Sequence, residues 1–320
     1  MKILLYTILT LLFLSCGNSK KKAIAENDAK KNSIPLFIAD SAYQYIKKQV
    51  DFGPRVPNTP QHVACGNYLE QKLNDFGAKV YTQHLDATAF DGTILKAKNI
   101  IGSYNISATS RILLFAHWDT RPWADNDPDK SNHTTPILGA NDGASGVGVL
   151  MEIARNLGRQ SPNIGIDIAF FDAEDYGSTA SNDNSWCLGT QYWAKNPHVQ
   201  GYNARYGILL DMVGATKAVF YREQISDYYA KHVVDNVWSQ AAALGFGQYF
   251  INEAGNGVTD DHLFVNTIRG IPSIDIIQFD RNTSTGFGSY WHTTNDTMEN
   301  IDKNTLQAVG TTLMQVIYNE

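Results

Sequence analysis

Histidine and carboxylate side chains recur beside apolar segments of this 320-residue chain, in combinations that could bind a metal and move protons. They are His117, Asp142, Glu174, Asp175, Asp211 and His292. Mixed histidine and carboxylate ligands suit Zn²⁺, with an open position for substrate if the site is catalytic. Each residue also has an ordinary explanation, such as a helix N-cap for Asp142 or a core histidine. The prediction of a metal site therefore depends on these residues meeting in space.

The stretch from Ile166 to Tyr176 shows how they could meet. Its first part, Ile-Asp-Ile-Ala-Phe-Phe, is nearly continuous in apolar residues and is typical of a central strand buried on both faces. The strand runs directly into Asp172, Glu174 and Asp175. In open α/β sheets the chemistry lies just beyond the carboxyl ends of the strands, so these carboxylates stand where an active site is expected.

Strand patterns alternate with helix patterns along the rest of the chain. Further strands are predicted at Lys79–His84, Lys98–Ser103, Arg111–Ala116, Tyr206–Asp211 and Ser273–Ile277. Helices are predicted around residues 65–76, 142–157, 188–193, 226–244, 260–270 and 303–318. This alternation predicts a doubly wound α/β fold with a mixed, largely parallel central sheet and helices on both faces.

The segment from Thr120 to Leu138 has no strand or helix pattern and carries three prolines, several aspartates and Trp123. It is too long to be a simple connection. Loops of this length in compact domains are usually functional or disordered.

Composition limits the class of protein. The chain is 43% hydrophobic and 18% charged with a net charge of -6, and after residue 40 it shows no change in composition that would divide it. We therefore expect one catalytic domain over residues 33–320. No basic run with interleaved aromatics occurs in it, which argues against nucleic-acid binding.

The amino terminus has the pattern of an export signal. One lysine precedes an apolar stretch that ends at Phe13-Leu-Ser-Cys16-Gly, which resembles a bacterial lipoprotein box. Residues 1–15 are predicted to be a signal peptide, Cys16 the lipidated residue and residues 16–32 a flexible tether. An ordinary cleaved signal or a membrane stub is the alternative. We expect a lipid-anchored protein that faces the periplasm, in which Cys65 and Cys187 either pair or remain buried thiols.

Several motifs together resemble a known family. They are His117-x-Asp119, Gly139-Ala-Asn-Asp142-Gly-Ala-Ser-Gly, Glu174-Asp175, Asp211-Met-Val-Gly and His292. The chain from about residue 40 to 320 is similar to the zinc-dependent aminopeptidase superfamily and, within it, to the glutaminyl cyclases. The resemblance implies two zinc ions in an aminopeptidase, with His117 and Asp211 on one ion, Asp175 and His292 on the other, and Asp142 bridging. In a cyclase it implies one zinc on Asp142, Asp175 and His292.

Local detail favours the cyclases. Trp291 stands directly before His292, and two consecutive aspartates, Asp260 and Asp261, precede His262. The insertion between His117 and Asp142 is long. Two departures from the animal cyclases are visible. Gly177-Ser-Thr-Ala occupies the stretch where they place a tryptophan, and Asp175 stands where they use a glutamate to bind the metal.

The resemblance implies a role for each candidate residue. Glu174 would carry a proton as base and then acid, and Asp211 with Asp260 would bind the substrate amine and share a proton. Trp291, Phe287 and Trp186 would form an apolar wall, unless they serve only core packing. His117 would be the remnant of a second metal site. The expected partners are peptides or proteins with an amino-terminal glutamine, which the enzyme would convert to pyroglutamate with release of ammonia.

Two other functions stay open on the sequence. A two-zinc aminopeptidase would use the same residues, with Glu174 activating a water molecule. A lipoprotein that keeps the fold for binding alone is a more distant alternative. Oligomeric state is not predicted.

Overall fold

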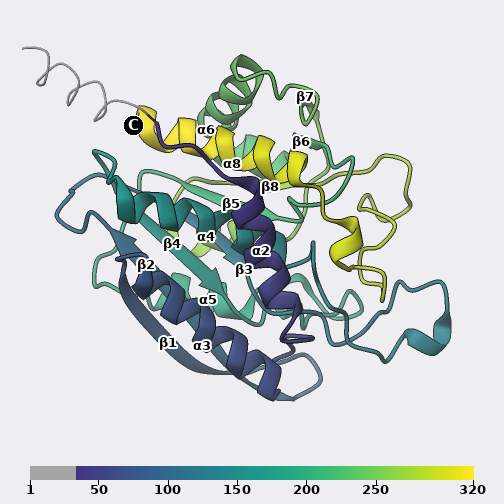
Figure 1. The fold of residues 1–320 in the computed structure, drawn as a ribbon. Helices are drawn as coiled ribbons and strands as arrows, with labels where there is room; N and C mark the ends of the chain where they lie inside the picture. Colours follow the sequence, from purple (N-terminus) through teal and green to yellow (C-terminus); the bar gives the residue numbers. More distant parts are fainter. Residues whose placement is uncertain (1–33) are drawn as a thin grey trace, which may run out of the picture. The chain divides into compact units, whose positions relative to one another are not determined.

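A six-stranded sheet in the order β1-β2-β4-β3-β5-β8 organises the computed structural model of this protein (Figure 1). Its strands are β1 (Lys79–Thr88), β2 (Ile94–Tyr104), β3 (Arg111–His117), β4 (Gly165–Phe171), β5 (Gly207–Asp211) and β8 (Ser273–Ile277). β4, β3, β5 and β8 run parallel, whereas β1 and β2 are antiparallel to their neighbours. The predicted fold class, mixed and largely parallel, is confirmed.

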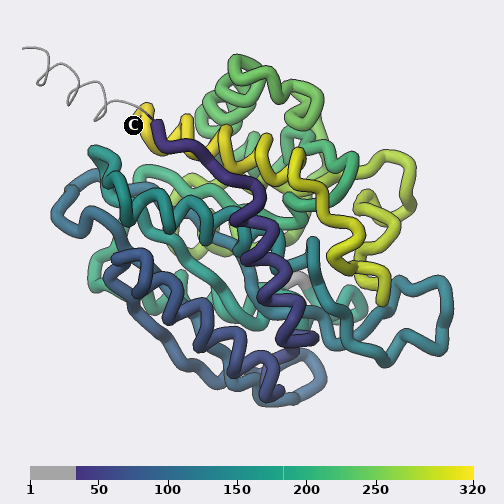
Figure 2. Tube along the Cα trace, in the orientation of Figure 1, coloured from purple at the N-terminus to yellow at the C-terminus, as the bar shows by residue number. Residues whose placement is uncertain are grey.

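Helices cover both faces because side chains alternate between the faces along each strand. On one face α4 (Ala144–Arg159) packs on β3, β4 and β5, and it is covered by α2 (Ala39–Val50) and α8 (Lys303–Asn319), which lie against each other (Figure 2). α3 (Pro60–Asp75) packs on β1 and β2.

On the opposite face α5 (Leu188–Lys195) packs on β1 and β2, and η3 (Val265–Arg269) packs against α5 and contributes Val265 to the core. Phe115, Phe171 and Trp193 form the centre of that core and are fully buried. α6 (Gln224–Ala243) packs against β8 and α8 at the end of the sheet.

Some elements were not predicted. Helix α2 was not predicted because its buried face has two small alanines and the polar Gln49 beside Ile46. The buried Gln49 donates its side-chain amide to the carbonyl of Ala144 at 3.1 Å. The parallel pair β6 (Phe220–Arg222) and β7 (Phe250–Ala254) is short and only partly buried. β1 and β2 extend beyond the predicted strands, since their partly exposed ends lack a continuous apolar run.

The structure describes residues 34–320, and Leu36–Glu320 form one compact unit. The predicted signal peptide, the lipidation site Cys16 and the tether lie outside the described residues. Within residues 34–320 none of the helices has the length and apolar character needed to cross a bilayer. Cys65 and Cys187 are both buried free thiols.

Candidate active site

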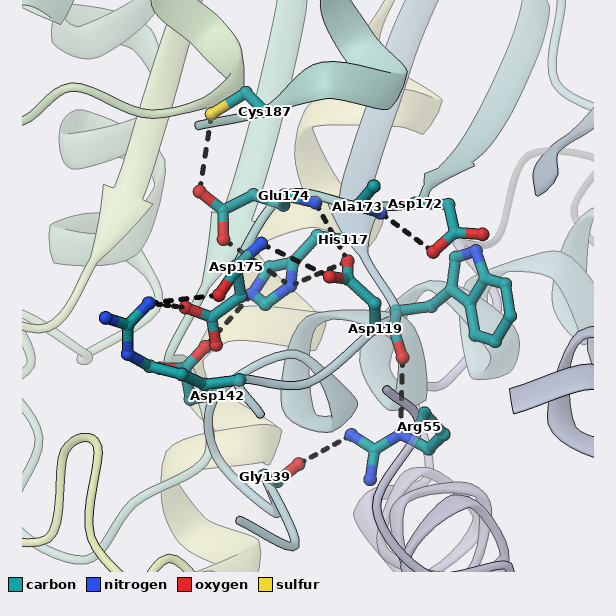
Figure 3. A network of polar contacts seen from close by, with 12 residues as sticks. Arg55, His117, Asp119, Gly139, Asp142, Asp172, Ala173, Glu174, Asp175 and Cys187 are labelled. Carbon is teal, nitrogen blue, oxygen red and sulfur yellow. Dashed lines mark hydrogen bonds and ion pairs between the residues drawn. The ribbon is translucent and has the colours of Figure 1, made fainter. Parts of the chain in front are cut away.

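The carboxyl ends of neighbouring parallel strands bring the predicted site residues together. His117 is the last residue of β3 and pairs in register with Phe171, the last residue of β4. Asp211 ends β5 on the other side of β3, and Asp172 to Asp175 follow β4. Figure 3 shows His117, Asp142, Glu174 and Asp175 converging from these different segments. His292 comes from the loop after β8.

Asp142, Asp175 and His292 form one group of possible metal donors. Nε2 of His292 lies 3.2 Å from Oδ1 of Asp175 and 3.5 Å from Oδ2 of Asp142. All three residues are buried, and one donor atom of each lies within 4.8 Å of the others. The structure thus assembles the three residues that the resemblance assigned to a single zinc.

His117, Asp142 and Asp211 form a second group that shares Asp142. Nε2 of His117 lies 3.1 Å from Oδ1 of Asp142 and 3.2 Å from Oδ1 of Asp211. The two oxygens of Asp142 therefore face different histidines. The two groups together have donors for two ions. Without a second ion, His117 can instead interact with the carboxylates of Asp142 and Asp211.

The site fits a divalent cation. Oδ2 of Asp175 is buried and has no hydrogen-bond partner among the described residues. Burial and the neighbouring charge of Asp142 raise the pKa of Asp175, because negative charges are gathered away from water. A cation among these oxygen and nitrogen donors would give the unpaired oxygen of Asp175 a partner and would offset the repulsion between the buried carboxylates. The donor types suit Zn²⁺.

Glu174 lies beside the donor groups and lines the adjacent cavity. Its side chain is only 12% exposed, and its Oε1 accepts a hydrogen bond from the thiol of Cys187 at 3.3 Å. Burial raises the pKa of Glu174 well above its usual range. His117 lowers this pKa, and the charges of Asp175 and Asp260 raise it further. A carboxylate with a raised pKa can both accept and return a proton near neutral pH.

Asp211 and Asp260 line the same cavity. Burial raises the pKa of Asp260 well above its usual range, and the charges of Asp211 and Asp261 raise it further. Burial also raises the pKa of Asp211. Oδ2 of Asp260 is buried without a hydrogen-bond partner among residues 34–320. The pair is therefore suited to hold a cationic or hydrogen-bond-donating group.

A cavity of about 280 Å³ opens beside these carboxylates. Trp186, Phe287 and Trp291 line it, as the sequence predicted, together with Met212, Val258 and Ile277, which it did not. The ring of Trp291 stacks on that of His292 with 3.7 Å between centroids. Trp186 lies so close to Gly177 that a Cβ there would come within 2.0 Å of its ring, so the indole packs against the chain immediately after the carboxylates. The cavity combines an acidic floor with an aromatic wall.

The backbone around the site is unusual. Ala173, Cys187, Met212 and His292 have φ angles of 53°, 55°, 48° and 54°, in the left-handed region that non-glycine residues seldom adopt. Met212 and His292 line the cavity, and Ala173 and Cys187 are the sequence neighbours of the lining residues Glu174 and Trp186. Such outliers persist only where the surrounding structure imposes them, and they gather at functional sites.

Two supporting carboxylates were not assigned roles from the sequence. Asp119 accepts the backbone N–H groups of Glu174 and Asp175 at 3.1 and 3.2 Å. Asp296 accepts those of Asn141 and Asp142 at 2.8 and 2.9 Å. Asp119 lies in the His-x-Asp motif, which is a usable signal. Asp296 lies in a polar loop with no pattern to distinguish it.

Comparison with known proteins places this site in a family. The profile of peptidase family M28 matches residues 99–317, which include every residue of the site described above. This chain belongs to peptidase family M28. The predicted membership of the zinc aminopeptidase superfamily is confirmed.

Within the M28 family, the chain is similar to bacterial glutaminyl cyclases. It is 60% identical to the glutaminyl cyclase of Bacteroides thetaiotaomicron, solved with bound N-acetylhistamine, with a TM-score of 0.89 over 90% of this chain and 100% of that one. A structure described as a Zn-dependent exopeptidase from Parabacteroides distasonis is 59% identical, with a TM-score of 0.89 over the same shares. The glutaminyl-peptide cyclotransferase of Bos taurus is 25% identical over 287 residues, 79% of this chain and 74% of that protein.

Proposed function

We infer that this M28 protein is a zinc-dependent glutaminyl-peptide cyclotransferase, which converts the amino-terminal glutamine of peptides or proteins to pyroglutamate and releases ammonia. The high identity to glutaminyl cyclases supports this function. The observation that carries it is that Asp211 and Asp260 both line the cavity beside Glu174. In an aminopeptidase Asp211 would instead serve a second metal.

We propose that one zinc is held by Asp142, Asp175 and His292. Bound there, zinc would supply Lewis-acid polarisation of the γ-carbonyl of the glutamine. His117, which lies within hydrogen-bond distance of both Asp142 and Asp211, would then need no metal of its own.

The protein groups around the cavity would perform the proton transfers. Asp211 and Asp260 would hold the substrate amine through hydrogen bonds, with one proton shared between them. Glu174 would take a proton from the amine as its nitrogen attacks the γ-carbonyl carbon. As the carbon–nitrogen bond to the side-chain amide breaks, Glu174 would return the proton to the departing nitrogen, which leaves as ammonia.

The aromatic wall would supply positioning. Ring closure needs the glutamine side chain folded back toward its own amine, and a cavity of about 280 Å³ has room for one such side chain. Trp291, Phe287 and Trp186 would hold it in that conformer and exclude water. Holding reacting groups in register can account for much of the acceleration.

One experiment tests the function and the main alternative together. Purified protein is given a peptide with an amino-terminal glutamine, ammonia release is followed, and metal content is measured on the same sample. We expect ammonia release above the uncatalysed rate with about one zinc per chain. Cleavage of aminoacyl anilides with about two zinc ions per chain would favour the aminopeptidase instead, as the exopeptidase description of one similar structure suggests.

We further propose that the enzyme is exported and anchored to a bacterial membrane through Cys16, facing the periplasm. The amino-terminal sequence supports this proposal. Labelling of the full chain with a fatty-acid analogue in cells tests it, and C16A should abolish the label. Label that persists in C16A would contradict the proposal.

A further inference from the structure

The long segment between Thr120 and Leu138 contacts the proposed zinc ligands. Asp127 accepts the backbone N–H and the hydroxyl of Thr294 at 3.0 and 2.6 Å, two residues beyond His292. The backbone N–H of Asn126 donates to the carbonyl of His292 at 3.1 Å. The loop is therefore fastened along the segment that carries the histidine ligand.

Arg121 contacts the other side of the same site. Its side chain is 5% exposed, and its Nη1 donates to the carbonyl of Asp175 at 3.0 Å and lies 3.5 Å from Oδ1 of that residue. The guanidinium thus fixes the main chain of Asp175 and faces its carboxylate. The remaining edge of the guanidinium binds Asp125 through two hydrogen bonds of 2.7 and 2.6 Å.

Asp125 in turn faces His292. Its Oδ1 lies 3.5 Å from Nδ1 of His292, while Nε2 of the same ring is directed at Asp142 and Asp175. A carboxylate beside Nδ1 favours the tautomer that carries a proton there and leaves Nε2 free for a metal. The chain of contacts runs from Asp175 through Arg121 and Asp125 to His292.

We propose that Arg121 and Asp125 are positioning residues for the metal site. They link two of the metal ligands, Asp175 and His292, so the long loop helps to hold these ligands in place. A guanidinium held by two parallel hydrogen bonds is well suited to this role, because its planar fork fixes distance and direction together. The inference rests on the proposed zinc site.

The test is the metal affinity of the full protein, measured by competition with a chromophoric chelator. D125N removes the negative charge beside Nδ1 of His292, and R121K keeps a positive charge but loses the two-point contact. We expect either change to weaken zinc affinity by about 10- to 100-fold, the usual effect of removing such an outer partner. The absorption spectrum of Co²⁺ bound in place of zinc should also shift, because the histidine is no longer held in one orientation.

D51N is the matched control. Asp51 pairs with Lys47 at the same four-residue spacing, and the aspartates are similarly exposed, 47% for Asp51 and 43% for Asp125. Asp51 lies at the end of α2. We expect D51N to leave both the zinc affinity and the cobalt spectrum unchanged.

The outcomes separate this inference from the proposed function. Wild-type zinc affinity and an unchanged cobalt spectrum in D125N and R121K would overturn the inference, even if the melting temperature falls, because the loop would then be only a structural tether. A wild-type protein that binds no metal would instead refute the zinc site itself.

Discussion

Glu174 is the residue on which the proposed chemistry depends most directly. Its carboxylate is buried beside the metal donors, and one of its oxygens accepts a hydrogen bond from the thiol of Cys187. This leaves the other oxygen as the natural acceptor for a substrate proton. The same burial that raises its pKa prepares it to release that proton again.

Replacing this carboxylate by its amide should remove the proton carrier without disturbing the fold. We expect E174Q to lower kcat for cyclisation by about 10²- to 10⁴-fold, with zinc content and melting temperature nearly unchanged. Ammonia release from a glutamine-initiated peptide measures the loss. E70Q, a change at a partly exposed glutamate of α3, is the control. Near-wild-type turnover in E174Q would exclude Glu174 as the proton carrier.

The sequence made the donor residues predictable but not the residues that hold them. His117, Asp142, Asp175 and His292 are recognisable by type and motif, and the structure brings them together. The contacts of Asp296, and those of Arg121 with Asp175 and of Asp125 with His292, depend on which loops meet, and no local pattern encodes that meeting. Cys187 could be noticed only as an unpaired cysteine, because its contact with Glu174 is made by the tertiary fold.

At the scale of elements, the site is set by how closely α4 approaches the sheet. A Cβ placed on Gly146 would lie 2.1 Å from the carbonyl oxygen of Leu210 in β5. Only a residue without a side chain allows the helix that follows Asp142 to sit against the strand that ends in Asp211. Their separation, and with it the shape of the site, is therefore fixed by a backbone contact.

An alanine at this position should push the two elements apart. We expect G146A to destabilise the protein by about 1–3 kcal/mol, since overpacking outweighs the better helix propensity of alanine. Urea unfolding measures the change. G247A is the control, because a Cβ on Gly247 meets nothing within 4 Å, and it should change stability by less than about 0.5 kcal/mol. Equal stability of the two variants would contradict the close-contact argument.

The elements themselves were predictable where the apolar pattern is strong. β3, β4 and β5 are buried along their length and could be read from near-continuous apolar runs. α2 could not, because its buried face has two small alanines and the polar Gln49 beside a single large apolar residue, Ile46. The pair β6 and β7 could not, because most of its residues are half-exposed or exposed. Periodicity reports burial of apolar side chains, so it fails where packing uses other groups.

For the whole molecule, the gathered carboxylates make stability depend on metal. Burial and mutual repulsion raise the pKa values of Asp175, Asp211 and Asp260. A cation that binds the native state and not the unfolded chain stabilises it by mass action.

Removing the metal should therefore lower the melting temperature. With zinc at about 1,000 times its Kd, the stabilisation is about 4 kcal/mol, which a chelator should abolish and added zinc restore. Calorimetry on samples of known zinc content measures it. An identical melting temperature for the zinc-free and zinc-loaded protein would show that the donors contribute no binding energy.

A second effect on overall stability comes from His198, away from the site. Burial lowers its pKa from 6.5 to about 4, and its Nδ1 accepts the indole N–H of Trp193 at 3.1 Å. Between these values the unfolded chain binds a proton that the native state does not. The contribution of neutral His198 to the free energy of unfolding is thus complete above pH 6.5 and is lost as pH falls toward 4.

We expect the wild-type protein to lose up to about 3 kcal/mol through this group as pH falls over that range. H198N keeps an acceptor for the indole and should show a smaller loss, measured by urea midpoints at several pH values. H232N, a change at an exposed histidine of α6, should behave as wild type. The same acid loss in H198N as in wild type would assign the effect to other groups.

The left-handed residues at the site have a consequence for how the molecule opens. Ala173, Met212 and His292 each carry backbone strain of about 1–3 kcal/mol, and all lie beside donor groups that repel one another when no cation is present. Strain and repulsion relax together if these segments detach while the sheet stays folded. Amide hydrogen exchange of the metal-free protein should therefore be fastest around these residues and slow within β3 and β4, so that the chemistry is located in the part of the fold that unfolds first.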